Sequence, residues 1–223
     1  CIPDKVNGFH YLYEAYVASD PNYTGKVTVP TLWDKKTKKI VNNESSEIIR
    51  MLNTEFNAIT GDRADFYPPA LRAEIDAVNE RIYQNVNNGV YRAGFAKSQA
   101  AYEEAYDGLF ATLDWLEQRL SRQRYLVDGQ ITEADWRLFP TLVRFDVAYF
   151  SIFKCNRQRI ADFPNLSNYM RELYQVPGVA GTVTPRYYVI SYYSIPRVNP
   201  TMIIPKGTPV DLGQPHNHAA VAV

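Results

Sequence analysis

Residues 27–52 read VTVPTLWDKKTKKIVNNESSEIIRML, and this stretch decides the fold of the first part of the chain. Residues 27–29 are β-branched and strand-like, and Pro30 after them marks a strand start, a sheet edge or a cis peptide bond. A polar hairpin turn leads to a second short strand, residues 39–41, and Glu44 then opens an amphipathic helix. The order strand, proline, strand and helix predicts an α/β unit.

The start of that helix is a candidate anion site. The first backbone amides of a helix and its dipole favour negative charge, and Ser45 adds a hydroxyl beside them. Glu44 suits an ammonium group that neighbours a bound carboxylate. Both residues are also common in ordinary helix caps, so the pair alone leaves a purely structural interpretation open.

The composition argues against several classes of function. The 223 residues include 24 basic and 24 acidic ones, and nucleic acid is not the expected partner, because phosphate neutralisation needs a concentrated positive face. No apolar run is long enough for a membrane span and no signal-peptide pattern is present, so a cytoplasmic location is expected. Cys1 and Cys155 have no metal or redox spacing, and His10, His216 and His218 have no metal or triad spacing, so no metal site is predicted.

The pattern changes after residue 57. Glycine, two prolines and several Asp and Asn residues over 57–69 are typical of a linker. Farther on, apolar residues recur at helical spacing. The predicted division is an incomplete α/β domain over 1–57, a linker over 58–69, an all-helical domain over 70–213 and a disordered tail over 214–223.

Two segments of the helical part carry specific predictions. Thr132 and Asp135 have the spacing of an N-terminal capping box. The helix that follows is apolar on nearly all sides, which predicts the centre of a bundle, with Pro140 marking a kink or an early helix end. Residues 87–89, Asn-Asn-Gly, are predicted to interrupt a helix as a short loop that exposes Tyr91.

Several stretches resemble one branch of a known family, the xi-class (omega-like) glutathione transferases that act as glutathionyl-hydroquinone reductases. The resemblance covers nearly the whole chain from about residue 9, and NESSEIIRMLN followed by NNGVYRAGFA is its most specific part. It implies a glutathione-transferase fold, in which a thioredoxin-like α/β domain precedes an all-α helical bundle, and it implies glutathione as co-substrate. Other matching stretches are VTVPTLWDKKT, YPPAL, ITEADWRLFPTLVRFDVAYFSIFKCN, PNLSNYMRELYQVPGVAGTV and VNPTMIIP.

The resemblance also assigns residues to a glutathione site. Val29 and Pro30 match the family's cis-proline segment, where the backbone of the residue before the proline pairs with the tripeptide. Glu44 and Ser45 match the acid–serine pair that holds the γ-glutamyl end. Lys26 stands where the family often has arginine, which keeps a cation for the glycyl carboxylate but loses the bidentate fork.

The family's catalytic motif, Cys-Pro-Trp-Ala, has no match in the chain. Its cysteine attacks the thioether sulfur of a glutathionyl-hydroquinone and lies in a β-α-β unit ahead of the proline strand, where this chain has a single predicted helix. Cys1 does not match, because no Pro-Trp follows it, so no catalytic residue is assigned within the chain. Either the chain is part of a longer protein with that cysteine, or it is a paralogue without it. We expect the first, because half a thioredoxin sheet would leave an open edge.

The resemblance places the aromatic substrate at Tyr91 and Tyr192. Phenolic hydroxyls can hold the oxygens of a hydroquinone among aromatic rings. The chain has 17 tyrosines, so a packing role stays open for both. Near the C-terminus the family has a His-Tyr run followed by Ser-His, whereas residues 191–196 here read SYYSIP. This difference indicates a diverged quinol site.

The sequence leaves three candidate functions to be compared. The first is a glutathione-dependent reductase of glutathionyl-hydroquinones or related aromatic conjugates. The second is a catalytically impaired paralogue that binds glutathione or phenolic ligands. The third, an assembly module built on a transferase fold, is disfavoured because it has no need of the NNGVYRAGFA stretch. The resemblance further implies a homodimer formed through the helical domain.

Overall fold

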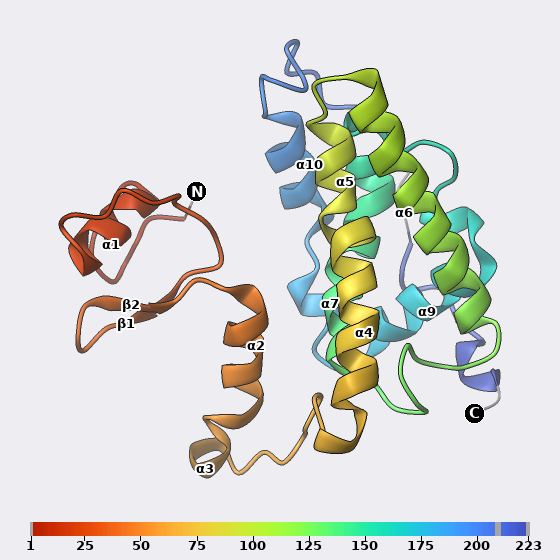
Figure 1. The fold of residues 1–223 in the computed structure, drawn as a ribbon, viewed down its shortest axis with the longest axis horizontal. Coiled ribbons are helices and arrows are strands. Elements are labelled where there is room, and N and C mark those ends of the chain that lie inside the picture. Colours follow the sequence, from red (N-terminus) through yellow and green to blue (C-terminus); the bar gives the residue numbers. More distant parts are fainter. Residues whose placement is uncertain (1, 208–210, 222–223) are drawn as a thin grey trace. The chain divides into compact units, whose positions relative to one another are not determined.

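The computed structural model describes residues 2–207 and 211–221, and Cys1 lies outside the described residues. The chain divides into two compact units, Cys1–Asp65 and Phe66–Val223 (Figure 1). The division falls inside the segment 58–69 that the sequence predicts to be a linker. The first unit is small and mixed, the second is entirely helical, and each is described by itself.

The N-terminal unit is built on one antiparallel hairpin. Its two strands pair Leu32 with Asn42, Trp33 with Ile40 and Asp34 with Lys39. The elements of the unit are α1 (Leu12–Ser19), β1 (Leu32–Asp34), β2 (Lys39–Asn42), α2 (Ser45–Thr54) and α3 (Asn57–Thr60).

The predicted strand at residues 27–29 does not form among the described residues. The strand propensity of Val-Thr-Val has no neighbouring strand to pair with here, and the segment is held instead by side-chain hydrogen bonds to the backbone of Thr28. Regular strand structure begins only at Leu32. Residues 27–29 therefore stay outside the sheet in spite of their strand propensity, because no strand pairs with them among the described residues.

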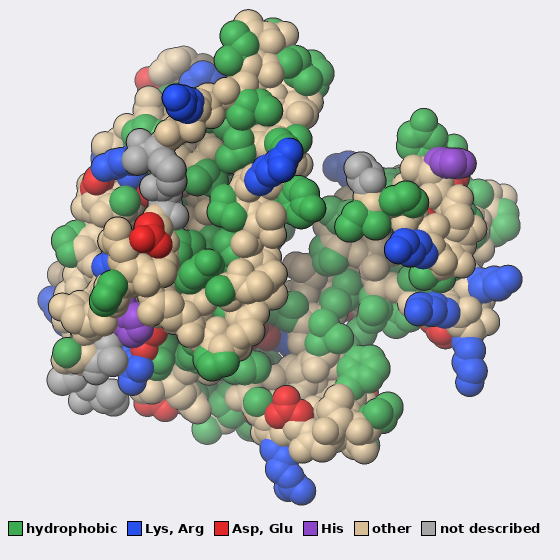
Figure 2. All heavy atoms as spheres, turned by 180° about the vertical axis from the view of Figure 1, so that it is seen from behind, with side chains coloured by type: hydrophobic (Ala, Val, Ile, Leu, Met, Phe, Trp, Pro, Cys, Tyr) green, Lys and Arg blue, Asp and Glu red, His purple; other side chains and the backbone are tan. Residues whose placement is uncertain are grey.

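The N-terminal unit leaves much of its apolar surface uncovered. Ala15, Tyr16 and Ile48 are its buried hydrophobic residues within the described part of the chain. Hydrophobic side chains are visible at the molecular surface in Figure 2. The exposed ones in this unit include Val27, Val29, Val41, Leu52, Phe56 and Ile59.

The C-terminal unit is a helical bundle with a continuous core. Its α-helices within the described residues are α4 (Arg72–Ile82), α5 (Gly89–Gly94), α6 (Gln99–Leu120), α7 (Glu133–Arg144), α8 (Phe150–Ile152), α9 (Pro164–Gln175) and α10 (Pro185–Tyr193). Helix α6 packs against α5 and α9, and α4 packs against α7. Most residues of the predicted apolar stripes are buried: Ile75, Val78, Ile82, Leu109, Leu113 and Leu116. Leu71, Tyr102 and Tyr106 of the same stripes are partly buried against this core.

The predicted Asn-Asn-Gly loop is wrong. A π-helical segment, Tyr83–Asn87, joins α4 to α5, so that the three form one helical rod (Figure 1). The Asn88 amide donates to the Tyr83 carbonyl at 2.9 Å, the wider spacing that absorbs the extra residue. Tyr91 therefore projects from a helix and is half-buried rather than exposed by a loop.

The apolar helix predicted at the bundle centre is confirmed as α7. It continues past Pro140 to Arg144, so the proline does not end it, and a π-helical segment, Phe145–Tyr149, follows. The sequence missed this second π segment, which is of a kind often found near functional sites.

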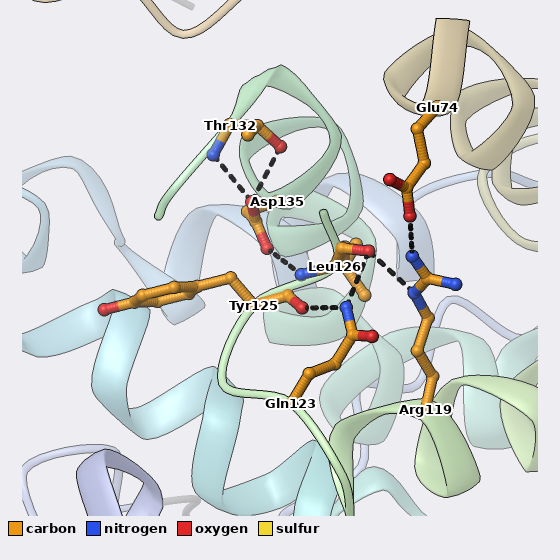
Figure 3. A network of polar contacts seen from close by, with 7 residues as sticks. All are labelled: Glu74, Arg119, Gln123, Tyr125, Leu126, Thr132 and Asp135. Atoms are coloured by element: carbon orange, nitrogen blue, oxygen red, sulfur yellow. Dashed lines mark hydrogen bonds and ion pairs between the residues drawn. The ribbon is translucent and has the colours of Figure 1, made fainter. Parts of the chain in front are cut away.

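The capping box at the start of α7 is confirmed and organises the loop before it (Figure 3). The Thr132 amide and hydroxyl donate to Asp135 at 2.7 and 3.0 Å, and the Leu126 amide donates to the same carboxylate at 2.9 Å. Tyr169 adds its hydroxyl at 2.8 Å. Burial raises the pKa of Asp135, and these donors oppose that shift by stabilising the carboxylate.

Part of the tail from residue 214 onward is ordered against the bundle, which differs from the sequence-based expectation of disorder. The Gln175 amide donates to the Gln214 carbonyl at 2.8 Å, and the Asn217 amide donates to Asn168 at 3.1 Å. His218 is buried, with Nε2 donating to the Arg124 carbonyl at 2.5 Å. The expectation of disorder rested on the polar, weakly patterned sequence of the tail, and a sequence pattern does not reveal polar contacts of this kind. Residues 222–223 lie outside the described residues.

Candidate functional site

Two groups of side chains match the predicted sites, one in each unit. In the N-terminal unit, Glu44 is the N-cap residue of α2 and Ser45 its first residue. The Glu44 amide donates to the Asn42 side chain at 2.6 Å, which fixes the approach of the chain to the helix. Both candidate side chains are exposed and make no hydrogen bond with another described residue. They are free to meet a ligand at the positive end of the helix dipole.

The peptide bond between Val29 and Pro30 is cis, as the family resemblance implies. The Val29 side chain is 77% exposed. Its backbone amide and carbonyl make no hydrogen bond within the part of the chain that the structure describes. An unpaired donor and acceptor on an exposed segment can pair with an extended peptide in the manner of a strand.

Lys26 directly precedes the segment 27–29, and its side chain is exposed. The Lys26 carbonyl accepts a hydrogen bond of 2.6 Å from the Tyr23 hydroxyl. The backbone at Lys26 is thereby fixed while the ammonium group keeps its freedom. A flexible ammonium suits a terminal carboxylate as a point charge.

The N-terminal unit also has an open hollow of about 460 Å³. It is lined by Thr54, Asn57, Gly61, Asp62, Arg63 and Asp65. None of the predicted site residues lines it. The candidate site therefore rests on the exposed groups described above.

In the C-terminal unit the two predicted tyrosines meet. The hydroxyls of Tyr91, on α5, and Tyr192, on α10, lie 2.5 Å apart. The hydroxyl of Tyr149, at the end of the second π segment, lies 3.3 Å from that of Tyr91 and 2.7 Å from that of Tyr192. Three phenolic oxygens thus converge at one point. We call Tyr91, Tyr149 and Tyr192 the tyrosine cluster.

Aromatic rings form the base of the tyrosine cluster. Phe153 stacks on Tyr149 with centroids 5.5 Å apart and meets Tyr91 and Tyr192 edge-on at 5.6 Å each. Gly94 makes this packing possible, because a Cβ there would lie 2.2 Å from the Phe153 ring. The second glycine of the NNGVYRAGFA stretch is therefore required by the close approach of a ring to helix α5.

Two hydroxyls of the tyrosine cluster, those of Tyr149 and Tyr192, stay protonated near neutral pH. Burial raises the pKa of Tyr149, and burial likewise raises that of Tyr192. Each phenol can both donate and accept one or more hydrogen bonds. A set of neutral donors and acceptors beside apolar rings suits a flat phenolic ligand with its own hydroxyl groups.

Sequence reasoning missed Tyr149. It lies in an apolar run that predicts bundle core, and it is indeed only 2% exposed. Its spacing of four residues from Phe153 is the one signal that both rings share a helical face. Two further tyrosines of α10 are engaged elsewhere: Tyr193 bonds Ser151, and Tyr188 lies under the guanidinium of Arg144 at 4.1 Å.

Among the described residues, the remaining candidate groups show no arrangement for chemistry. Burial raises the pKa of the Cys155 thiol to about 12, so it stays protonated and unreactive. Within residues 2–207 and 211–221, no three His, Cys, Asp or Glu side chains gather in a way that could hold a metal ion. In the same residues, none of the helices has both the length and the apolar character needed to span a membrane.

Two family models match the chain. The model for the glutathione S-transferase N-terminal domain matches residues 6–55, and the model for the C-terminal domain matches residues 99–172. The two matches fall in the two structural units in the order expected for a transferase.

Curated relatives extend this similarity. Glutathionyl-hydroquinone reductase PcpF of Sphingobium chlorophenolicum is 55% identical over 92% of this chain and 66% of its own length. Glutathionyl-hydroquinone reductase YqjG of Escherichia coli is 52% identical over 92% of this chain and 63% of its own length. The chain thus spans about two thirds of the length of the curated relatives it matches.

Solved structures agree closely in fold. The glutathione-bound structure of the Escherichia coli YqjG protein has a TM-score of 0.96 at 50% identity, covering 98% of this chain and 71% of its own. The xi-class transferase of Natrialba magadii has a TM-score of 0.95 at 44% identity, covering 99% and 68%. The chain belongs to the glutathione transferase family. Within that family its similarity is to the xi class, with the fold of a thioredoxin-like domain followed by a helical bundle.

Proposed function

We propose that the protein is a glutathione-dependent reductase of glutathionyl-hydroquinones or related aromatic conjugates. The observation that carries the proposal is the convergence of three phenolic hydroxyls over an aromatic base. The other unit of the chain exposes the candidate glutathione-binding groups of Lys26, Val29, Glu44 and Ser45. The names of the two reductases described above support it. Tyr91 and Tyr192 are proposed to hold the oxygens of the quinol ring.

The glutathione moiety is proposed to bind in the N-terminal unit. Val29 would pair its backbone with the tripeptide beside Pro30, and Glu44 and Ser45 would hold the γ-glutamyl end. Lys26 would neutralise the glycyl carboxylate. The exposure and unpaired state of these groups among the described residues supports this assignment.

The nucleophile is assigned to a cysteine outside this chain, because the buried Cys155 does not ionise readily. A thiolate attacks the sulfur of the glutathionyl-hydroquinone, which forms a mixed disulfide and breaks the bond between sulfur and the aromatic carbon. That carbon keeps the electron pair and takes up a proton, which gives the hydroquinone. A second glutathione thiolate then attacks the mixed disulfide, which releases glutathione disulfide and restores the cysteine.

Calorimetric titration with glutathione tests the assignment of Glu44 and Ser45 to the glutathione site. In the complete protein, Glu44→Ala and Ser45→Ala should each weaken binding by about 1–3 kcal/mol, the cost of losing a charge-assisted hydrogen bond. Thermal unfolding should change little, since both side chains are exposed. Unchanged affinity in both variants would remove the assignment.

The second candidate function is a binder of glutathione or phenolic ligands without turnover. The sequence SYYSIP at residues 191–196 favours it, because the histidines of the family's C-terminal run are absent there. Tyr192 nevertheless reaches the tyrosine cluster. A ligand-binding role and a slow reductase therefore differ only in product formation, which decides between them.

A homodimer through the helical domain and a cytoplasmic location complete the proposal. Exposed apolar side chains at the C-terminal end of the helical unit support an interface between copies: Tyr187, Ile190, Met202, Ile203 and Ile204. Light scattering of the complete protein at micromolar concentration tests this point. A monomer would count against it.

A further inference from the structure

Tyr16 is a buried polar side chain that the proposed chemistry does not use. It is 3% exposed and lies on α1, in a unit where few other side chains of the described residues are buried. Its aromatic ring alone would be enough to fill the small core of this unit. The position of its hydroxyl indicates a further role.

The Tyr16 hydroxyl holds the segment that contains the cis-proline. It donates to the Thr28 carbonyl at 2.8 Å, and the Thr28 amide lies 3.3 Å from the same oxygen. The Thr31 hydroxyl lies 3.3 Å away and itself donates to the Thr28 carbonyl at 3.0 Å. The Tyr16 and Thr31 hydroxyls thus both donate to the Thr28 carbonyl. The residues on both sides of Val29 and Pro30 meet at that carbonyl, which the Tyr16 hydroxyl holds.

The Tyr16 hydroxyl also holds the approach to α2. The Asn43 side-chain amide donates to the Tyr16 hydroxyl at 3.2 Å and lies 3.2 Å from the Thr28 hydroxyl. Asn43 directly precedes Glu44, the N-cap residue of α2. A single phenolic oxygen therefore connects the two segments that would bind opposite parts of a tripeptide.

A second tyrosine extends this arrangement to Lys26. The Tyr23 ring lies 4.9 Å from that of Tyr16, and its hydroxyl donates to the Lys26 carbonyl at 2.6 Å. Gly25 allows the Tyr23 hydroxyl to fold back this closely, because a Cβ at residue 25 would lie 2.6 Å from it. Two tyrosines thus hold residues next to the proposed glutathione contacts: Tyr23 holds the Lys26 backbone, and Tyr16 holds the Thr28 backbone and the Asn43 side chain.

We propose that Tyr16 is a positioning residue of the glutathione site, which sets the distance between the segment 28–31 and the start of α2. The inference rests on the proposed function. Tyr16 touches no ligand in this scheme: it acts through Thr28 and Asn43. Its loss should weaken glutathione binding by loosening a preorganised site, without removing a contact to the ligand.

Glutathione titration by calorimetry with the complete protein tests the inference. Tyr16→Phe keeps the ring and removes the shared oxygen, and we expect the dissociation constant to rise by about 3- to 10-fold, the effect of a typical hydrogen bond. Tyr13→Phe is the matched control, because Tyr13 lies on the same helix and is 51% exposed. Its dissociation constant should change by less than about twofold, as is usual for an exposed site.

A double-mutant cycle separates positioning from general destabilisation. If Tyr16 orients Glu44 through Asn43, the effect of Tyr16→Phe on glutathione affinity should shrink when Glu44 is already alanine. A general loss of stability would act equally in both backgrounds. Asn43→Ala is the second variant, and it should reproduce the loss of affinity even if Tyr16→Phe folds poorly.

The outcomes separate this inference from the proposed function. If the wild-type protein fails to bind glutathione, both are overturned. If it binds, Glu44→Ala weakens binding, and Tyr16→Phe and Asn43→Ala do not, the positioning role alone is overturned. Equal effects of Tyr16→Phe in the wild-type and Glu44→Ala backgrounds would also overturn it.

Discussion

Replacing Gly94 by alanine should damage the tyrosine cluster from a residue that touches no substrate. The new Cβ would lie 2.2, 2.3 and 2.7 Å from the Cγ, Cδ1 and Cβ atoms of Phe153. Carbon atoms pack at about 3.5–4.0 Å, so the ring must move by roughly 1.5 Å. Phe153 is fully buried and stacked on Tyr149, so it cannot yield without displacing that hydroxyl.

The energetic cost follows from two opposing terms. Overpacking of a well-filled core costs about 1–3 kcal/mol, and replacing glycine by alanine in a helix returns up to about 1 kcal/mol. A net loss of about 1–2 kcal/mol in the free energy of unfolding is expected. For a protein of this size it corresponds to a fall in melting temperature of roughly 2–8 °C.

Gly89 supplies a matched control on the same helix. A Cβ there would meet the Gln84 carbonyl at 3.6 Å and Leu109 at 4.0 Å, which are ordinary contacts. Gly89→Ala should therefore stabilise the protein by up to about 1 kcal/mol. Thermal and urea unfolding followed by circular dichroism measure both variants. If Gly94→Ala is as stable as Gly89→Ala, the packing argument for the base of the tyrosine cluster is wrong.

Three further predictions concern single side chains. Asp135→Ala should lower the free energy of unfolding by about 2–4 kcal/mol in urea titrations, because it removes a cap and leaves the buried Leu126 amide unpaired; a loss below 1 kcal/mol would contradict this. Burial lowers the pKa of His218 below its ordinary 6.5. As the pH falls through 6.5, the unfolded chain therefore takes up the proton first, and the folded state loses stability. His218→Gln should flatten this dependence of stability on pH, measured by unfolding between pH 5 and 8. Tyr91→Phe should reduce turnover of a glutathionyl-hydroquinone while Tyr188→Phe should not, because only the Tyr91 hydroxyl belongs to the tyrosine cluster; equal steady-state rates in the wild type and Tyr91→Phe would reduce Tyr91 to a packing role.

Local signals in the sequence predicted several features of the fold correctly. The Thr132 and Asp135 spacing specifies a capping box because all its atoms lie within one helical turn. The cis bond before Pro30 followed from the family resemblance, and it is found in the structure. The helical stripes predicted the core of the bundle because burial follows a period of 3.6 residues.

Features that depend on distant partners could not be predicted in this way. Tyr149 reads as core until Tyr91 and Tyr192 are brought to it from two other helices. Tyr16 likewise reads as one apolar position of a short helix, and its role depends on Thr28 and Asn43. The π segment at Tyr83–Asn87 also escaped, because Asn-Asn-Gly favours a turn unless tertiary packing keeps the helix continuous.

Product analysis with one glutathionyl-hydroquinone and excess glutathione tests the central claim most directly. The complete protein should form hydroquinone and glutathione disulfide in equal amounts, at a rate that Tyr91→Phe lowers. Binding of glutathione without formation of hydroquinone would contradict the reductase and leave a ligand-binding paralogue.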